Sequence, residues 1–191
     1  MNPTKRVLTF LLMLVGLLGR EATAQSNEKP SQKVLDYIEQ FRSLAVEEMK
    51  RSGIPASITL AQGICESGAG SSRLAVEANN HFGIKCKKEW TGPTITHTDD
   101  HPNECFRKYS TAAESYRDHS DFLRSRPHYA SLFLLDPLDY KGWAYGLKRA
   151  GYATSPTYPQ SLLRVIELYQ LFQYDQSVQV LPASPAGSSN E

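Results

Sequence analysis

The sequence has little of what marks a nucleic-acid-binding or strongly adsorbing protein. Among 191 residues, 21 lysines and arginines nearly balance 20 aspartates and glutamates, so the formal net charge is +1. Such a balance gives no electrostatic footprint for nucleic acid or for anionic surfaces. The chain also has no internal repeat and no sign of a second folded domain, so we expect one domain with a proper core.

Long apolar runs are equally scarce. The one candidate, Val7 to Leu18, follows Lys5 and Arg6 and precedes small residues that end at Ala24. This is the pattern of a signal peptide, and the run is too short to span a bilayer comfortably. We therefore expect cleavage near Ala24 and export to the periplasm or beyond without stable membrane insertion, with an uncleaved anchor as the alternative.

The remaining chain divides by composition. Residues 25–30 are polar and are predicted to form a short leader, and residues 31–175 carry the patterns of a folded domain. Residues 176–191 are rich in serine, proline, alanine and glycine and are predicted to be disordered.

Cysteine is rare, with three in the chain. Export permits a disulfide, and an odd count leaves one thiol over. Cys86 and Cys105 flank the same strand-rich segment, so we expect them to pair. Cys65 lies in an apolar helical run and is predicted to be a small buried hydrophobe.

The local patterns are mainly helical. Apolar periodicity, caps and breakers predict an α+β protein, mainly α, in which a small antiparallel sheet of two or three strands is inserted within residues 79–110. The predicted helices cover residues 31–51, 56–66, 71–78, 111–124, 136–150 and 158–172, with one short turn at 129–134.

The stretch from Thr59 to Leu74, TLAQGICESGAGSSRL, is the first candidate for chemistry. It places one acid, Glu66, where a buried helix ends and a glycine-rich turn begins. Apolar walls raise the pKa of a carboxyl group, and a protonated carboxyl can donate to a leaving-group oxygen, as in glycoside cleavage. The alternative is a solvated acid beside a plain glycine C-cap.

A second carboxylate is expected across the groove from Glu66. The predicted strand lobe offers Glu89, Asp99, Asp100 and Glu104. Asp99 and Asp100 stand where a strand meets a turn and can overhang a cleft, although two adjacent acids also form ordinary solvated turns.

Aromatic side chains favour a saccharide ligand, because sugar rings present flat C–H faces to aromatic planes. Phe82, Trp90, Tyr152 and Tyr158 are the candidates. Core packing is the competing interpretation and is the stronger one for Phe82. Tyr152 and Tyr158 flank a loop, where a functional role is more common.

Two rival chemistries, a metal site and a cysteine nucleophile, have less support in the sequence than glycoside cleavage. Histidines 81, 97 and 101 and the cysteines of the lobe follow no metal-binding spacing. A cysteine nucleophile at Cys65 would stand near a helix end, where the dipole disfavours a thiolate, rather than at a helix start.

Four segments, in order, resemble the glucosaminidase family of bacterial peptidoglycan hydrolases (glycoside hydrolase family 73), which includes the flagellar rod-cap hydrolase and many autolysins. They are AQGICESGAGSSRLA, NNHFGIKC, CFRKYSTAAESYRDHSDFL and GLKRAGYATSPTYPQSLLRVIE. The resemblance implies a lysozyme-like helical body with a small β-lobe. It also implies endo-β-N-acetylglucosaminidase activity on the β-1,4 bonds of peptidoglycan glycan strands.

The resemblance also implies roles for residues. Glu66 matches the general acid, Asp99 the lobe carboxylate that acts as base or nucleophile, and Tyr158 a tyrosine near the acid. Tyr152 lies in the segment of Tyr158, and Asp121 matches a helical acid that we interpret as structural. Asp100 and Glu104 are the next candidates after Asp99.

The expected mechanism needs neither metal nor organic cofactor. Glu66 protonates the glycosidic oxygen, and either a lobe carboxylate or the N-acetyl group of the substrate assists the second half of the reaction. We expect a monomer. Muramidase specificity on the same fold, and a non-catalytic wall-binding module, are the alternative functions.

Overall fold

The computed structural model describes residues 29–99 and 101–176. The predicted signal peptide, most of the leader, Asp100 and residues 177–191 of the predicted tail lie outside the described residues. Within the described ranges, no helix combines the length and the apolarity that crossing a membrane requires.

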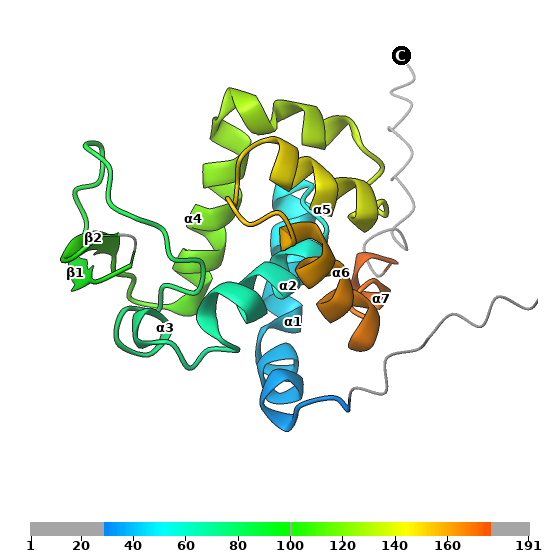
Figure 1. The fold of residues 1–191 in the computed structure, drawn as a ribbon, viewed down its shortest axis with the longest axis horizontal. Coiled ribbons are helices and arrows are strands. Elements are labelled where there is room, and N and C mark those ends of the chain that lie inside the picture. Colours follow the sequence, from blue (N-terminus) through cyan, green and yellow to red (C-terminus); the bar gives the residue numbers. More distant parts are fainter. Residues whose placement is uncertain (1–28, 100, 177–191) are drawn as a thin grey trace, which may run out of the picture.

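Helix α2 is the centre of the helical body (Figure 1). Each of its residues from Ala56 to Ile64 is buried, because helices surround it. Only its C-terminal end reaches the surface. The helices that contact α2 (Ala56–Ser67) are α1 (Gln32–Ser52), α5 (Tyr140–Arg149), α6 (Tyr158–Leu168) and α7 (Gln173–Gln176).

The helices predicted from the sequence are present with small differences. Helices α1 and α2 begin and end within a residue or two of the predicted positions. The short turn predicted at 129–134 is part of a longer 3-10 helix, η1. The elements not yet given bounds are α3 (Arg73–Ala78), α4 (Ala112–Ser125) and η1 (Pro127–Leu134).

Two predicted helix boundaries are wrong, the start of α5 and the end of α6. Helix α5 begins at Tyr140 and not at Asp136, because Asp136 accepts a hydrogen bond from Leu138 N (2.9 Å) in a turn, and Asp139 caps the helix by accepting from Gly142 N (2.8 Å). Helix α6 ends at Leu168 rather than near residue 172, because Gln170 adopts a left-handed conformation with φ of 53°.

The last helix holds the first turn of α2. Asp175 of α7 is buried and accepts hydrogen bonds from Ser57 N (2.8 Å) and Ser57 Oγ (2.6 Å). Pro55 precedes α2 and makes no side-chain cap. A residue 118 positions away therefore satisfies a backbone donor at the start of this helix.

The predicted β-lobe is a two-stranded antiparallel sheet at one end of the molecule, beyond α3 and α4 (Figure 1). Strands β1 (Thr94–His97) and β2 (Glu104–Arg107) pair with Ile95 opposite Phe106. Lys85 forms an isolated bridge to Phe106 on the other side of β2. The fold is therefore α+β and mainly α, as predicted.

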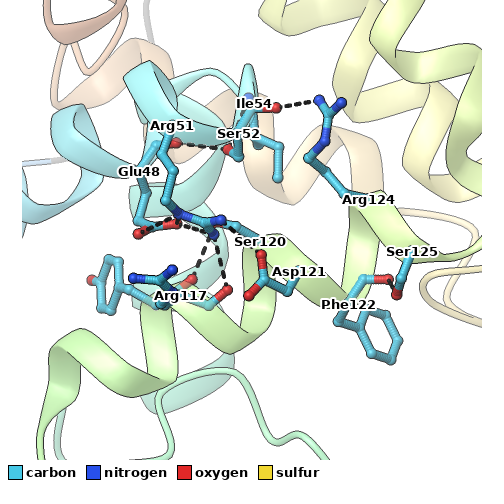
Figure 2. A network of polar contacts seen from close by, with 11 residues as sticks. Glu48, Arg51, Ser52, Ile54, Arg117, Ser120, Asp121, Phe122, Arg124 and Ser125 are labelled. Atoms are coloured by element: carbon cyan, nitrogen blue, oxygen red, sulfur yellow. Dashed lines mark hydrogen bonds and ion pairs between the residues drawn. The ribbon is translucent and has the colours of Figure 1, made fainter.

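Helices α1 and α4 are clamped together by Arg51 (Figure 2). Its guanidinium binds Glu48 (2.7 Å) on α1 and Asp121 (2.8 Å) on α4. Arg124 of α4 donates in turn to the carbonyl oxygen of Ser52 (2.6 Å). The ion pair of Asp121 agrees with a structural role for this acid, and the clamp fixes the helix that forms one wall of the cavity described below.

A buried polar network joins α1 and α4 to the segment after α3. The Tyr37 hydroxyl lies 3.1 Å from His81 Nδ1 and 2.9 Å from the Tyr116 hydroxyl. Gly63 of α2 leaves room for it, because a Cβ at this position would collide with the Tyr37 hydroxyl. The network holds the segment of Phe82 against the body.

Candidate active site

A cavity of about 310 Å³ lies between the helical body and the β-lobe. Its walls come from the end of α2, the segment between α3 and β1, helix α4 and the loop after α5. The lining residues that matter below are Glu66, Phe82, Lys85, His119, Phe122 and Tyr152.

A larger hollow of about 590 Å³ lies between α1 and α3 and does not include Glu66. Its buried imidazole, His81, is bound by Tyr37, and burial lowers the pKa of His81 to about 4. Because it holds a neutral histidine and no residue assigned to catalysis, the smaller cavity is the better candidate for chemistry.

Glu66 stands in the last turn of α2, and the turn after it carries the chain away at once. Gly68 ends the helix in a left-handed conformation with φ of 56°, which glycine adopts without strain. The Glu66 side chain is exposed on the side that faces the cavity, while protein atoms displace water on its other sides. This desolvation, and secondarily the Asp99 carboxylate, raises the pKa of Glu66 to about 7.

Two stacked tyrosines stand beside Glu66. The rings of Tyr152 and Tyr158 are 5.6 Å apart, and Tyr158 is buried while Tyr152 is half-buried and lines the cavity. Burial first, and the nearby Glu66 carboxylate among other causes, raise the pKa of both hydroxyls well above the usual range. Both therefore stay protonated and can serve as hydrogen-bond donors.

Gln62 directs the Tyr158 hydroxyl. It is fully buried one turn before Glu66, and its side-chain amide nitrogen donates to the Tyr158 oxygen at 2.9 Å. Since an amide nitrogen only donates, the hydroxyl oxygen accepts in this bond and its own proton remains available to another acceptor.

Asp99 of the lobe is not part of the cavity lining but contacts Lys85, which is. Asp99 follows β1, its side chain is 54% exposed, and its Oδ2 lies 3.2 Å from the Lys85 ammonium. Its charge is the smaller of the two causes that raise the pKa of Glu66. Glu104 binds Lys85 more closely, at 2.8 Å, and this hydrogen bond above all lowers the pKa of Glu104.

The predicted disulfide is confirmed. Cys86 and Cys105 are bonded with a Cα–Cα distance of 5.4 Å, and Cys86 N donates to the Cys105 carbonyl at 2.8 Å. The prediction for Cys65 is wrong, because this thiol is exposed. It lies near the end of α2, where the helix leaves the core, so helical position and not apolar neighbours decides its exposure. Desolvation and the Glu66 carboxylate raise the pKa of Cys65 to about 11, which disfavours a thiolate nucleophile.

The other predicted site residues have different environments. Phe82 lines the cavity but is buried, with its ring stacked on His119 at 4.0 Å. Trp90 lies outside the cavity lining, between the guanidinium of Arg107 (4.7 Å) and the carbonyl oxygen of Pro93, which accepts from its indole at 3.0 Å. Asp100 lies outside the described residues.

In the part of the chain that the structure describes, the histidines and cysteines considered above as metal ligands do not form a metal site. Two of them, Cys86 and Cys105, are joined to each other. Across residues 29–99 and 101–176, no three histidine, cysteine, aspartate or glutamate side chains gather as a metal would require.

Three residues near Glu66 were missed by the sequence reasoning. Gln62 stands four residues before Glu66, and this helical spacing places both on one face. Lys85 directly precedes Cys86 of the disulfide, and no spacing in the sequence relates it to Glu66. His119 is fully buried, and neither ring nitrogen has a hydrogen-bond partner among the described residues; burial lowers its pKa to about 3, so it is neutral.

Comparison with known proteins identifies the family. Residues 42–171 match the glucosaminidase family, described as mannosyl-glycoprotein endo-beta-N-acetylglucosaminidase. The exo-glucosaminidase LytG of Bacillus subtilis (strain 168) is 33% identical over 82% of this chain and 58% of its own length. The peptidoglycan hydrolase FlgJ of Vibrio parahaemolyticus is 31% identical over 68% of this chain and 45% of its own. The chain spans about half the length of these relatives.

Solved structures agree with this result. A peptidoglycan hydrolase from Sphingomonas sp. A1 matches with a TM-score of 0.64 and 27% identity, over 79% of this chain and 99% of that one. The glycoside hydrolase domain of Salmonella typhimurium FlgJ matches with a TM-score of 0.63 and 29% identity, over 75% and 92%. With the family match covering more than half of the chain, the protein belongs to the glucosaminidase family of glycoside hydrolases.

Proposed function

We propose that this protein is an exported peptidoglycan hydrolase that cleaves the β-1,4 bond after N-acetylglucosamine in glycan strands. The observation that carries the proposal is Glu66, a carboxyl group with a pKa of about 7 that lines a cavity between two lobes. At neutral pH much of it is protonated, which is the state that a general acid needs. Membership of the glucosaminidase family supports the substrate class.

In the proposed reaction, Glu66 donates its proton to the glycosidic oxygen as the bond breaks through an oxocarbenium-like state. Asp99 faces the developing positive charge and serves as base or nucleophile in the second step. Assistance by the N-acetyl group of the substrate is the alternative route, and an unchanged rate in Asp99→Asn would favour it.

The aromatic side chains are assigned by their surroundings. Tyr152 offers a half-buried ring in the cavity wall for a sugar face, and Phe82 supports the same wall from beneath. The Tyr158 hydroxyl, with its oxygen bound by Gln62, donates toward Glu66 or the bound sugar. That Trp90 and Asp100 contact the substrate stays a prediction. Such contacts would be made with sugars that extend beyond the cavity.

The decisive experiment is digestion of purified peptidoglycan by wild type and Glu66→Gln. Mass spectrometry should detect new reducing-end N-acetylglucosamine with wild type only. Reducing-end N-acetylmuramic acid would mean a muramidase, and binding without any product would mean a wall-binding module. Products released one at a time from the chain ends would mean an exo-acting enzyme. This is the activity in the name of the Bacillus subtilis relative.

Export is proposed on the basis of the substrate and of the N-terminal pattern. Peptidoglycan lies outside the cytoplasmic membrane, and the positively charged start followed by an apolar run is typical of a signal peptide. An N-terminus at Gln25 in protein recovered from the cell envelope would support cleavage after Ala24. Size-exclusion chromatography tests the expected monomer.

A further inference from the structure

We infer that Lys85 is a positioning residue, whose ammonium group holds the Asp99 carboxylate over the cavity opposite Glu66. The inference rests on the proposed function, because it gives Lys85 a part in that reaction. Three observations carry it: the fixed backbone of Lys85, the contacts of its ammonium group, and its place in the cavity wall.

The backbone of Lys85 is fixed from both sides. Before it, Ile84 N donates to Asn80 Oδ1 (3.0 Å), and the Asn80 amide donates to the carbonyl oxygens of Ile84 (3.0 Å) and Arg107 (2.8 Å). After it, Cys86 is joined to Cys105 of β2 by the disulfide. The side chain thus starts from a rigid point, which limits where the ammonium group can go.

The ammonium group reaches two acids of the lobe. It lies 2.8 Å from Glu104 and 3.2 Å from Asp99, and 5.6 Å from the centre of the Phe106 ring. The second oxygen of Glu104 accepts from His101 N (3.2 Å), and Asp99 N donates to His101 O (3.3 Å). Lys85 and Glu104 therefore tie down the turn that carries Asp99.

Asp99 needs such a restraint. Its side chain is 54% exposed, so packing does little to choose among its rotamers. A freely rotating carboxylate would spend part of its time pointing to solvent. The salt bridge to Lys85 selects orientations in which the carboxylate lies beside this ammonium group, and Lys85 lines the same cavity as Glu66.

Charge near the reaction follows from this arrangement. The groups facing Glu66 are the Asp99 carboxylate, the Cys65 thiol, the hydroxyls of Tyr152 and Tyr158, the ammonium groups of Lys85 and Lys87, and the neutral His119. Among the described residues, the Lys85 ammonium contacts the carboxylates of both Asp99 and Glu104. The Asp99 carboxylate therefore has a fixed place from which it can meet an oxocarbenium-like transition state.

The test uses six variants of the full chain, among them Asp99→Asn alone and Lys85→Gln, with soluble glycan fragments of peptidoglycan as substrate. Lys85→Met removes the charge and keeps an apolar stem over Phe106, Lys85→Arg restores a cation, and Lys88→Met is the matched control. Lys88 is an exposed lysine of the same lobe and is not part of the cavity wall. The double variant combines Lys85→Met with Asp99→Asn.

We expect kcat of Lys85→Met to fall about tenfold or more, as a misplaced reactive group predicts, with KM changing by less than about twofold. Lys85→Arg should recover most of the loss, and Lys88→Met should match wild type. In the Asp99→Asn background, Lys85→Met should cost nothing further, because the residue acts through Asp99.

Additive losses in the double variant would overturn the inference, as would a Lys85→Met enzyme with wild-type kcat. Thermal unfolding accompanies each assay, and Lys85→Gln provides a second substitution. If neither Met nor Gln at this position yields a folded protein, Lys85 serves lobe stability instead, and the inference is equally wrong. The Glu66→Gln digestion is independent of all these outcomes, so failure here leaves the proposed function standing.

Discussion

The two carboxylates of the proposed reaction are held in opposite ways. Glu66 stands in the last turn of a helix whose residues from Ala56 to Ile64 are buried, so the core of the body fixes its backbone. Asp99 stands in a turn of the lobe, half-exposed, and is oriented by a salt bridge to Lys85. The acid is placed by packing, and its partner is placed by charge.

This difference has a chemical use. A general acid needs a raised pKa, which the desolvated position of Glu66 supplies. Asp99 instead keeps contact with water and with the Lys85 ammonium. The following predictions test how far the contrast between body and lobe extends, from the largest expected effect to the smallest.

The largest effect is on turnover. Glu66→Gln should lower kcat by about a thousandfold or more, since general acid catalysis contributes on the order of 10²–10⁴-fold. Asp99→Asn should cost about 10- to 100-fold, because the substrate N-acetyl group can substitute in part. Rates of reducing-end formation measure both, with Glu77→Gln as an exposed control acid of α3. Equal losses at the two positions would contradict the contrast.

Opening the disulfide should affect the lobe and leave the body intact. The double substitution Cys86→Ser and Cys105→Ser releases a link across 19 residues, worth about 3 kcal/mol in the loop-entropy account. We expect about a tenfold loss of kcat, because Asp99 and Lys85 become less ordered, and faster proteolysis within residues 94–107.

The main unfolding transition of the body should change less than the proteolysis rate. Reducing agent should reproduce the loss in wild type and in the control Cys65→Ser, and should not affect the double variant. An unchanged rate of catalysis after reduction would mean that lobe order is not needed.

The pH profile should separate the two causes of the raised pKa of Glu66. Activity requires the protonated acid, so kcat/KM should fall as the pH rises through about 7. Asp99→Asn removes a like charge, and the alkaline limb should move to lower pH. It should stay above the ordinary value of 4.5, since desolvation remains the larger cause. No movement would mean that Asp99 does not face Glu66.

The smallest effect is on stability. The pKa of Glu66 is higher in the folded than in the unfolded chain, so its contribution is fully present below the unfolded pKa and is lost as the pH rises through about 7. Glu66→Gln avoids this loss. Because Glu66 is exposed, solvent screening keeps the effect of the shift to about 1 kcal/mol. The Tm of Glu66→Gln should therefore exceed that of wild type by about 2–4 °C at pH 8.

At pH 4 the two proteins should unfold at nearly the same temperature, because Glu66 is protonated in both folded and unfolded wild type. Scanning calorimetry at the two pH values makes the measurement. A lower Tm of the Gln variant at pH 8 would show that Glu66 stabilises the fold, contrary to the desolvation that raises its pKa.

The sequence allowed the helical body and the position of Glu66 near a helix end to be predicted, because both depend on local patterns. Apolar spacing marks α1 and α2, and the glycines after Glu66 mark the end of the helix. Pairing of Cys86 with Cys105 followed from their position on either side of one strand-rich segment.

The lobe side of the cavity depends on contacts between separate segments of the chain, and local sequence patterns do not predict such contacts. Lys85 and Asp99 are fourteen positions apart, and only the pairing of β1, β2 and the bridge at Phe106 brings them together. The environment of Trp90 likewise depends on Arg107 across the lobe. Exposure of Cys65 depends on where α2 leaves the core, which its apolar neighbours conceal.

The bond from Asp175 to Ser57 sets the shortest piece of this chain that can work. Helix α2 carries Glu66 at one end and relies at the other on a carboxylate from the last described turn. A cut before residue 175 would remove no residue of the cavity and would still uncap the helix that carries the acid. Expression of the domain alone must therefore extend through α7.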